Sequence, residues 1–94
     1  MAKQGDERST VHYTGNVQGV GFRYTTRSIA QRFAVTGHVQ NLPDGRVKLV
    51  AEGTPTEIKA FLKGVRERLC DHVRDERTDV GPATGEFDGF EIQH

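Results

Sequence analysis

Hydrophobic residues near the start of the chain alternate with polar ones, which is the pattern of a half-buried β-strand. Val11 and Tyr13 fall on one face of this pattern, and Gly15 interrupts it. The preceding residues 1–9 are polar and show no periodicity, so they cannot bury enough apolar surface to offset the entropy cost of ordering. We therefore expect a flexible tail over residues 1–9 and a single domain over residues 10–94.

Two later segments show the three- and four-residue spacing of amphipathic helices. The first helix is predicted to begin at Phe22 and to end before Gly37. Its apolar positions are Phe22, Thr26, Ile29, Ala30 and Phe33. The second helix follows a capping box, in which Thr54 offers an N-cap hydroxyl, Pro55 suits the first helical position and Glu57 stands at the third. Its apolar positions are Ile58, Phe61, Leu62, Val65 and Leu69.

Three further segments are predicted to form strands. Residues 38–42 and 46–53 flank the turn sequence Pro-Asp-Gly at 43–45, with Gly45 suited to the left-handed position, so they form a hairpin. Residues 73–80 are mostly charged, which is typical of an edge strand that is protected from pairing with other chains. A short strand closes the chain on the anchors Phe87, Phe90 and Ile92.

The order strand, helix, strand, strand, helix, strand predicts an α+β fold of the ferredoxin-like split βαβ type, a βαββαβ sandwich. We expect an antiparallel sheet with both helices on one face. The first and third strands should be neighbours at the centre of the sheet, and we expect the second strand beside the first. Residues on the second strand can then approach the loop that follows the first strand.

Composition restricts the classes of partner. The 13 Lys and Arg residues balance 13 Asp and Glu residues, so no broad electrostatic field attracts nucleic acid or an anionic membrane. The single Cys70 excludes an internal disulfide and fits a reducing compartment, and no apolar run is long enough to span a membrane, so we expect a cytoplasmic protein. The four histidines and Cys70 lack the spacing of metal ligands, so we expect no metal and no cofactor.

The most informative segment is residues 17–23, which place glycine-rich backbone and an arginine between the first strand and the first helix. Gly19 and Gly21 permit a backbone that points N–H groups inward, and the helix N-terminus adds partial positive charge. Arg23 supplies a planar fork that can make two hydrogen bonds to one phosphate. The predicted phosphate-binding residues are Gln18, Gly19, Val20, Gly21, Phe22 and Arg23. A tight strand-to-helix turn with an exposed arginine explains the same residues, and Tyr24 replaces the third glycine that a dinucleotide loop requires.

Asn41 is the second candidate for a functional role. It lies on the predicted second strand and shares the face of Val39, so it should point toward the helix-covered side or the rim of the loop. There its carboxamide could orient a water molecule near a phosphate held by Arg23. Asparagine also commonly begins turns, so starting the turn at Leu42 and Pro43 is an alternative role.

Several of these motifs resemble those of the acylphosphatase family. The similar segments are residues 17–23, 36–41, 42–47, 52–53 and 89–92, and the resemblance extends over residues 10–93. The first two segments are specific as a pair, because both their sequences and their separation agree with the family. His38 departs from the pattern, since the family more often has tryptophan at this position.

The resemblance implies hydrolysis of acyl phosphates to a carboxylate and inorganic phosphate, without a metal and without a covalent enzyme intermediate. It implies catalytic roles for two residues: Arg23 binds the phosphate and Asn41 orients the attacking water. The implied substrate is a small acyl phosphate, and we expect a monomer that stands alone because the chain stops at His94. The alternative is a non-enzymatic binding module, either acylphosphatase-like or a ferredoxin-like RNA-binding domain, although RNA binding requires exposed aromatic residues on the central strands.

Overall fold

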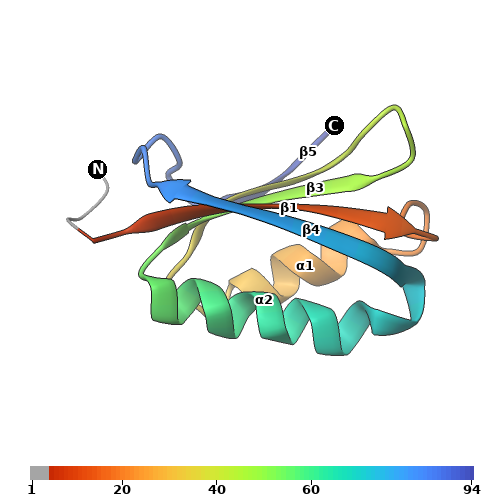
Figure 1. The fold of residues 1–94 in the computed structure, drawn as a ribbon, viewed down its shortest axis with the longest axis horizontal. Helices are drawn as coiled ribbons and strands as arrows, with labels where there is room; N and C mark the ends of the chain where they lie inside the picture. The colour runs from red at the N-terminus through yellow and green to blue at the C-terminus, as the bar shows by residue number, and fades with distance from the viewer. Residues whose placement is uncertain (1–4) are drawn as a thin grey trace.

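The structure is a computed structural model, and it describes residues 5–94. In chain order the elements are β1 (Glu7–Gly15), α1 (Phe22–Ala30), β2 (Thr36–Asn41), β3 (Val47–Gly53), α2 (Pro55–Leu69), the 3-10 helix η1 (Cys70–His72), β4 (Val73–Pro82) and β5 (Phe90–Gln93). Both α-helices cover the same face of a single sheet (Figure 1). The predicted element order and the two-layer α+β architecture are confirmed.

The strand order in the sheet is β4-β1-β3-β2-β5. β1 pairs antiparallel with β3 and β4, and β2 pairs antiparallel with β3, whereas β5 runs parallel to β2. The sheet is therefore mixed rather than wholly antiparallel. The expectation that the second strand lies beside the first is wrong, because the hairpin strand β3 returns into the space between β1 and β2.

The first strand begins earlier than predicted. β1 starts at Glu7 rather than near Thr10, and its pairing with β3 and β4 includes Ser9, which is buried. The end of the expected tail thus gains ladder hydrogen bonds on both sides, and these offset the entropy of ordering it. Residues 1–4 of that tail lie outside the described residues.

The first helix ends earlier than predicted, at Ala30 instead of just before Gly37. Beyond it, the Arg32 N–H donates to the Ile29 carbonyl at 3.0 Å and the Phe33 N–H donates to the Ala30 carbonyl at 3.1 Å. Such three-residue hydrogen bonds tighten the chain into turns at a helix end. The backbone must become extended before β2 can pair with β3, so the apolar spacing continues through Phe33 without a continuous helix.

The hydrophobic core lies between the sheet and the two helices. Phe61 of α2 is fully buried at its centre, with ring centroids 6.2 Å from Phe33 and 5.4 Å from Phe90 of β5. Near the β1–α1 connection, the buried rings of Tyr13 and Phe22 pack with centroids 5.0 Å apart. This contact fixes the first residue of α1 against β1, and it therefore positions the loop that joins them.

The capping box of α2 forms only in part. The Glu57 N–H donates to the Thr54 hydroxyl at 3.2 Å, and Pro55 occupies the first turn as predicted. The Glu57 carboxylate does not reach back to the cap, because its Oε1 accepts a hydrogen bond from the Ala34 N–H at 2.8 Å. The glutamate thus links the start of α2 to the chain that leaves α1.

Glu52 holds the segment before β5 against the face of the sheet that the helices leave open. Its carboxylate accepts hydrogen bonds from Arg8 Nε at 2.7 Å, from the Thr84 N–H and hydroxyl at 3.0 and 3.1 Å, and from the Gly85 N–H at 2.9 Å. Burial alone would raise the pKa of Glu52, but these donors reverse that effect and hold the pKa below its usual value. The carboxylate therefore tethers the segment that delivers β5 to β2.

Candidate active site

The β1–α1 connection, residues 16–21, lies at the end of the sheet that also carries the β2–β3 hairpin (Figure 1). Val17 is fully buried and anchors it, while Gly19 and Gly21 adopt left-handed φ angles of 77° and 78°. α1 begins without a side-chain cap and without an acidic residue in its first turn. The N–H groups of residues 18–21 donate no hydrogen bond to any described residue, so they and the positive end of α1 are available to an anion.

Gln18 connects this loop to the β2–β3 hairpin. Its Nε2 donates to the Leu42 carbonyl at 2.8 Å and to the Arg46 carbonyl at 2.9 Å. The loop is thereby held to the turn beyond β2, although β3 separates β2 from β1 in the sheet. Because the side-chain amide is occupied in this way, Gln18 can offer a ligand its backbone N–H group.

Arg23 lies in the first turn of α1 and is half-buried. Its Nη1 is 3.4 Å from Nδ1 of His94. Within residues 5–94 it takes part in none of the ion pairs. An arginine that no carboxylate neutralises retains its full charge and its planar fork for an anionic ligand. The contact with His94 has no signal in the sequence, because the two residues lie 71 positions apart.

Asn41 is the last residue of β2, where it pairs with Val47 across the hairpin. It shares the face of Val39, which is fully buried in the core, as strand alternation predicts. The Asn41 Oδ1 is buried and has no hydrogen-bond partner among the described residues. An unsatisfied buried acceptor costs about 1–3 kcal/mol, so this oxygen favours a water or ligand that donates to it.

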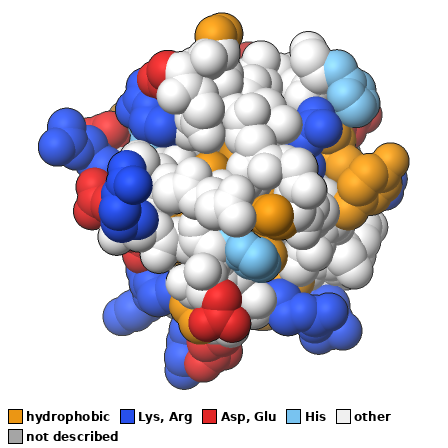
Figure 2. Space-filling view, turned by 90° about the vertical axis from the view of Figure 1, so that its right-hand side faces the viewer, with side chains coloured by type: hydrophobic (Ala, Val, Ile, Leu, Met, Phe, Trp, Pro, Cys, Tyr) orange, Lys and Arg blue, Asp and Glu red, His pale blue; other side chains and the backbone are white. Residues whose placement is uncertain are grey.

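Arg23 and Asn41 line the same cavity, which has a volume of about 240 Å³. Its other lining residues are Val17, Gly19, Gly21, Phe22 and Tyr24. Figure 2 looks onto this end of the molecule, where backbone and uncharged polar surface, with a histidine and small hydrophobic patches among it, occupies the centre and charged side chains of both signs lie around the rim. The structure thus brings together the predicted arginine, the predicted asparagine and most of the predicted loop.

The residues that line the cavity differ from the predicted binding residues at three positions. Gln18 and Val20 do not line the cavity, since the first is tied to the hairpin and the second packs partly against the core. Tyr24 does line it, and the sequence reasoning assigned it no role. A large aromatic residue next to Arg23 and outside the apolar stripe of the helix is the signal that could have found it.

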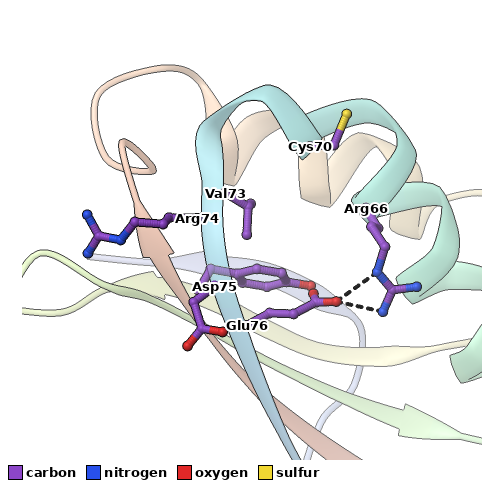
Figure 3. Close-up of a pocket in the computed structure, with 7 residues that line it drawn as sticks. Arg66, Cys70, Val73, Arg74, Asp75 and Glu76 are labelled. Carbon is purple, nitrogen blue, oxygen red and sulfur yellow. Dashed lines mark hydrogen bonds and ion pairs between the residues drawn. The ribbon is translucent and has the colours of Figure 1, made fainter.

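A larger cavity of about 320 Å³ lies between the end of α2 and the start of β4 (Figure 3). Its one cation–anion contact joins Arg66 Nη2 to Glu76 Oε1 at 2.7 Å. The guanidinium of Arg74 and the sulfur of Cys70 point away from one another (Figure 3). Because its polar groups do not converge on a common point, this cavity offers no anion site comparable to the one at Arg23.

The described part of the chain lacks the features of a metal site, a membrane-spanning helix or a base-stacking surface on its central strands. Within residues 5–94, no three His, Cys, Asp or Glu side chains lie together in an arrangement that could hold a metal ion. None of the helices formed by these residues has the length and apolar character needed to cross a membrane. Tyr13, an aromatic residue on a central strand, is only 1% exposed, so its ring cannot stack on a nucleic-acid base.

The family model described as acylphosphatase matches residues 9–92 of this chain. An acylphosphatase of Syntrophus aciditrophicus is 46% identical over 88 residues, which are 92% of this chain and 91% of that protein. A crystal structure of acylphosphatase from Bacillus subtilis superposes with a TM-score of 0.83 at 28% identity, covering 94% of this chain and 99% of that one.

The same fold also occurs within a longer protein. The crystal structure of T. kodakarensis HypF matches with a TM-score of 0.80 at 27% identity, over 94% of this chain but only 12% of HypF. The acylphosphatases of Syntrophus aciditrophicus and Bacillus subtilis, by contrast, match along nearly their whole length. With a family match over residues 9–92 and a relative of 46% identity, this chain belongs to the acylphosphatase family.

Proposed function

We propose that this protein hydrolyses acyl phosphates in the cavity between the β1–α1 loop and the end of β2. In this proposal Arg23 and the N–H groups of the loop bind the phosphoryl oxygens, and Asn41 orients the attacking water. The observation that carries the proposal is the shared cavity, in which Arg23, without a carboxylate partner among residues 5–94, and the buried Asn41 Oδ1, without a hydrogen-bond partner among the same residues, occur together.

The reaction needs positioning and charge stabilisation more than it needs proton transfer. The water oxygen forms a bond to phosphorus while the bond between phosphorus and the carboxylate oxygen breaks, and the carboxylate leaves with the electron pair. The proton lost by the water goes to phosphate or solvent. A carboxylate is a good leaving group because its pKa is low, so a general acid is not required. Charge that spreads over the phosphoryl oxygens is stabilised by Arg23, the loop N–H groups and the N-terminus of α1.

Asn41 fits the role of orienting water for a geometric reason. Its Oδ1 can accept a hydrogen bond from one O–H of the water, which leaves an oxygen lone pair free to attack phosphorus. The amide cannot act as a base, so its contribution is to hold the water in position. Loss of the side chain should therefore reduce turnover and leave phosphate binding nearly unchanged.

We infer further that the protein acts as a monomer in the cytoplasm. Its balanced charge of 13 basic and 13 acidic residues and its single cysteine support this inference, because they fit a reducing compartment and do not favour anionic macromolecules. Size-exclusion chromatography with light scattering tests the oligomeric state, and a mass of two chains would contradict it.

Hydrolysis of benzoyl phosphate in the presence of a chelator, followed by ultraviolet absorbance, tests the proposed activity. Wild type should turn over well above the buffer rate. Arg23→Gln should lose about 3 kcal/mol of transition-state stabilisation, which is a loss of about 100-fold in kcat/KM. The matched control is Arg27→Gln, since Arg27 is exposed on the same helix and does not line the cavity.

Asn41→Ala separates water positioning from phosphate binding. We expect kcat to collapse while inhibition by inorganic phosphate remains close to wild type. An equal loss of phosphate inhibition would assign Asn41 to binding instead, and full activity in Arg23→Gln would remove Arg23 from the mechanism.

A further inference from the structure

Tyr24 is an aromatic residue in the first turn of α1 that remains largely exposed. Its side chain is 73% exposed, and the only other large hydrophobic residue of comparable exposure in the described chain is Val80, on the edge strand β4. Hydrophobic surface is sparse on the end of the molecule that carries the cavity (Figure 2). The Tyr24 ring also forms no aromatic pair with another described residue. The core thus makes no use of this ring, although the ring borders the cavity.

The other walls of the cavity leave little apolar surface for a ligand. Gly19 and Gly21 have no side chains, and the side chains of Val17 and Phe22 are committed to the core at 0% and 2% exposure. Of the remaining lining side chains, Arg23 and Asn41 are polar and are assigned to phosphate and water. The aromatic ring next to them is therefore the one apolar surface that the described lining residues present to the rest of a substrate.

An acyl phosphate has two ends with different chemistry. Its phosphoryl group is charged and belongs beside Arg23, whereas its acyl group projects away from the phosphorus and can be apolar. Tyr24 directly follows Arg23 in the first turn of α1 and lines the same cavity, so an acyl group that extends from a phosphate held by Arg23 can reach its ring. We propose that Tyr24 determines specificity by packing against the acyl group, so that the enzyme favours aromatic and large apolar acyl phosphates over acetyl phosphate. This inference rests on the proposed function of the cavity.

The contact acts on the acyl group and not on the phosphate. An aromatic ring packed against a benzoyl group gains both buried apolar area and a ring–ring interaction, whereas a methyl group gains little of either. Because the ring contacts the acyl group from one side only, the preference for benzoyl phosphate over acetyl phosphate that it provides should be modest, on the order of five-fold in kcat/KM. The tyrosine hydroxyl is not needed for this contact, so phenylalanine should serve equally well.

The test is the ratio of kcat/KM for benzoyl phosphate to kcat/KM for acetyl phosphate, measured for wild type, Tyr24→Ala, Tyr24→Phe and the control Arg27→Ala. Comparing ratios between variants cancels the different intrinsic reactivities of the two substrates. Tyr24→Ala should lower the ratio about five-fold, while Tyr24→Phe and Arg27→Ala should leave it within about two-fold of wild type. Inhibition by inorganic phosphate should be unchanged in all four proteins.

Each other outcome overturns the inference in a recognisable way. An unchanged ratio in Tyr24→Ala, with both substrates still hydrolysed, rejects the role of Tyr24 and leaves the proposed function intact. Equal losses on both substrates, together with weaker phosphate inhibition, would mean that Tyr24 supports the phosphate loop instead. A wild-type protein that hydrolyses neither substrate would reject the proposed function itself. Because Tyr24 is mostly exposed, its truncation should not unfold the domain, and circular dichroism verifies this.

Discussion

Replacing Gln18 by alanine removes the side chain that holds the β1–α1 loop, residues 16–21, to the β2–β3 hairpin. The amide makes two hydrogen bonds, to the carbonyls of Leu42 and Arg46. Neither carbonyl loses its last partner, because the Leu42 carbonyl still accepts from the Gly45 N–H at 3.1 Å and the Arg46 carbonyl still accepts from the Leu42 N–H at 2.8 Å. The cost is therefore limited to the two bonds themselves, at about 1 kcal/mol each.

These two bonds place the loop relative to Asn41, so their loss should appear mainly in catalysis. About 2 kcal/mol of lost positioning corresponds to about a 30-fold decrease in kcat/KM for benzoyl phosphate. If the same 2 kcal/mol is lost from the free energy of unfolding, the midpoint of thermal unfolding should fall by about 8–16 °C at most. Gln18→Glu should be worse than Gln18→Ala, because a carboxylate cannot donate to the two carbonyls and brings negative charge beside the phosphate site.

The matched control is Gln40→Ala. Gln40 stands one residue before Asn41 on β2, so its side chain points to the opposite face of the sheet and does not line the cavity. It should keep nearly wild-type kcat/KM. If Gln18→Ala also kept wild-type kcat/KM and wild-type phosphate inhibition, the loop would be held by its own backbone and the reasoning would be refuted.

Two further predictions concern stability and pH. Glu52→Gln should lower the free energy of unfolding at pH 7 by about 2 kcal/mol, since an amide cannot satisfy the Arg8, Thr84 and Gly85 donors together. Because the pKa of Glu52 is lower in the folded state than its usual value of 4.5, wild type has this stabilisation above pH 4.5 and loses it as the pH falls through the folded-state pKa. Urea denaturation should therefore show a steeper loss of stability at acid pH in wild type than in Glu52→Gln. Burial, with Lys48 and other cations nearby, lowers the pKa of His38 from its usual 6.5. The unfolded chain then binds a proton at His38 more readily than the folded protein does, so wild type should lose stability as the pH falls below about 6.5. His38→Phe should lose less stability over the same range, and plots of unfolding free energy against pH that run parallel for the two proteins would contradict this.

The order of helices and strands could be predicted from the sequence because each element depends on local hydrophobic periodicity. The alternation of Val11 and Tyr13 and the spacing of Phe61 and Val65 report which face of a strand or helix is buried, and both pairs lie in the core. Boundaries were less predictable. The chain leaves α1 after Ala30 because β2 must pair with β3, which is a requirement set by a distant segment.

The resemblance carried by residues 17–23 and 36–41 identified the family, and local chemistry alone identified a phosphate loop and an arginine. The prediction that Arg23 and Asn41 lie together agrees with the structure, but the strand adjacency from which it was argued was wrong, because β3 separates β2 from β1. The side chain of Gln18 connects the loop to the turn of the β2–β3 hairpin through the carbonyls of Leu42 and Arg46, a contact that has no signal in the sequence.

Some features follow from each residue and its near neighbours, and the sequence alone was enough to predict them. These are the helices and strands and their order, the glycines that permit positive φ angles in the loop, and the positive charge of the candidate site. Three features come from the tertiary structure: β5 pairs parallel to β2, the Asn41 Oδ1 is buried without a partner among the described residues, and Tyr24 borders the cavity. These features depend on contacts between segments far apart in the chain, and such contacts arise from the packing of the whole domain.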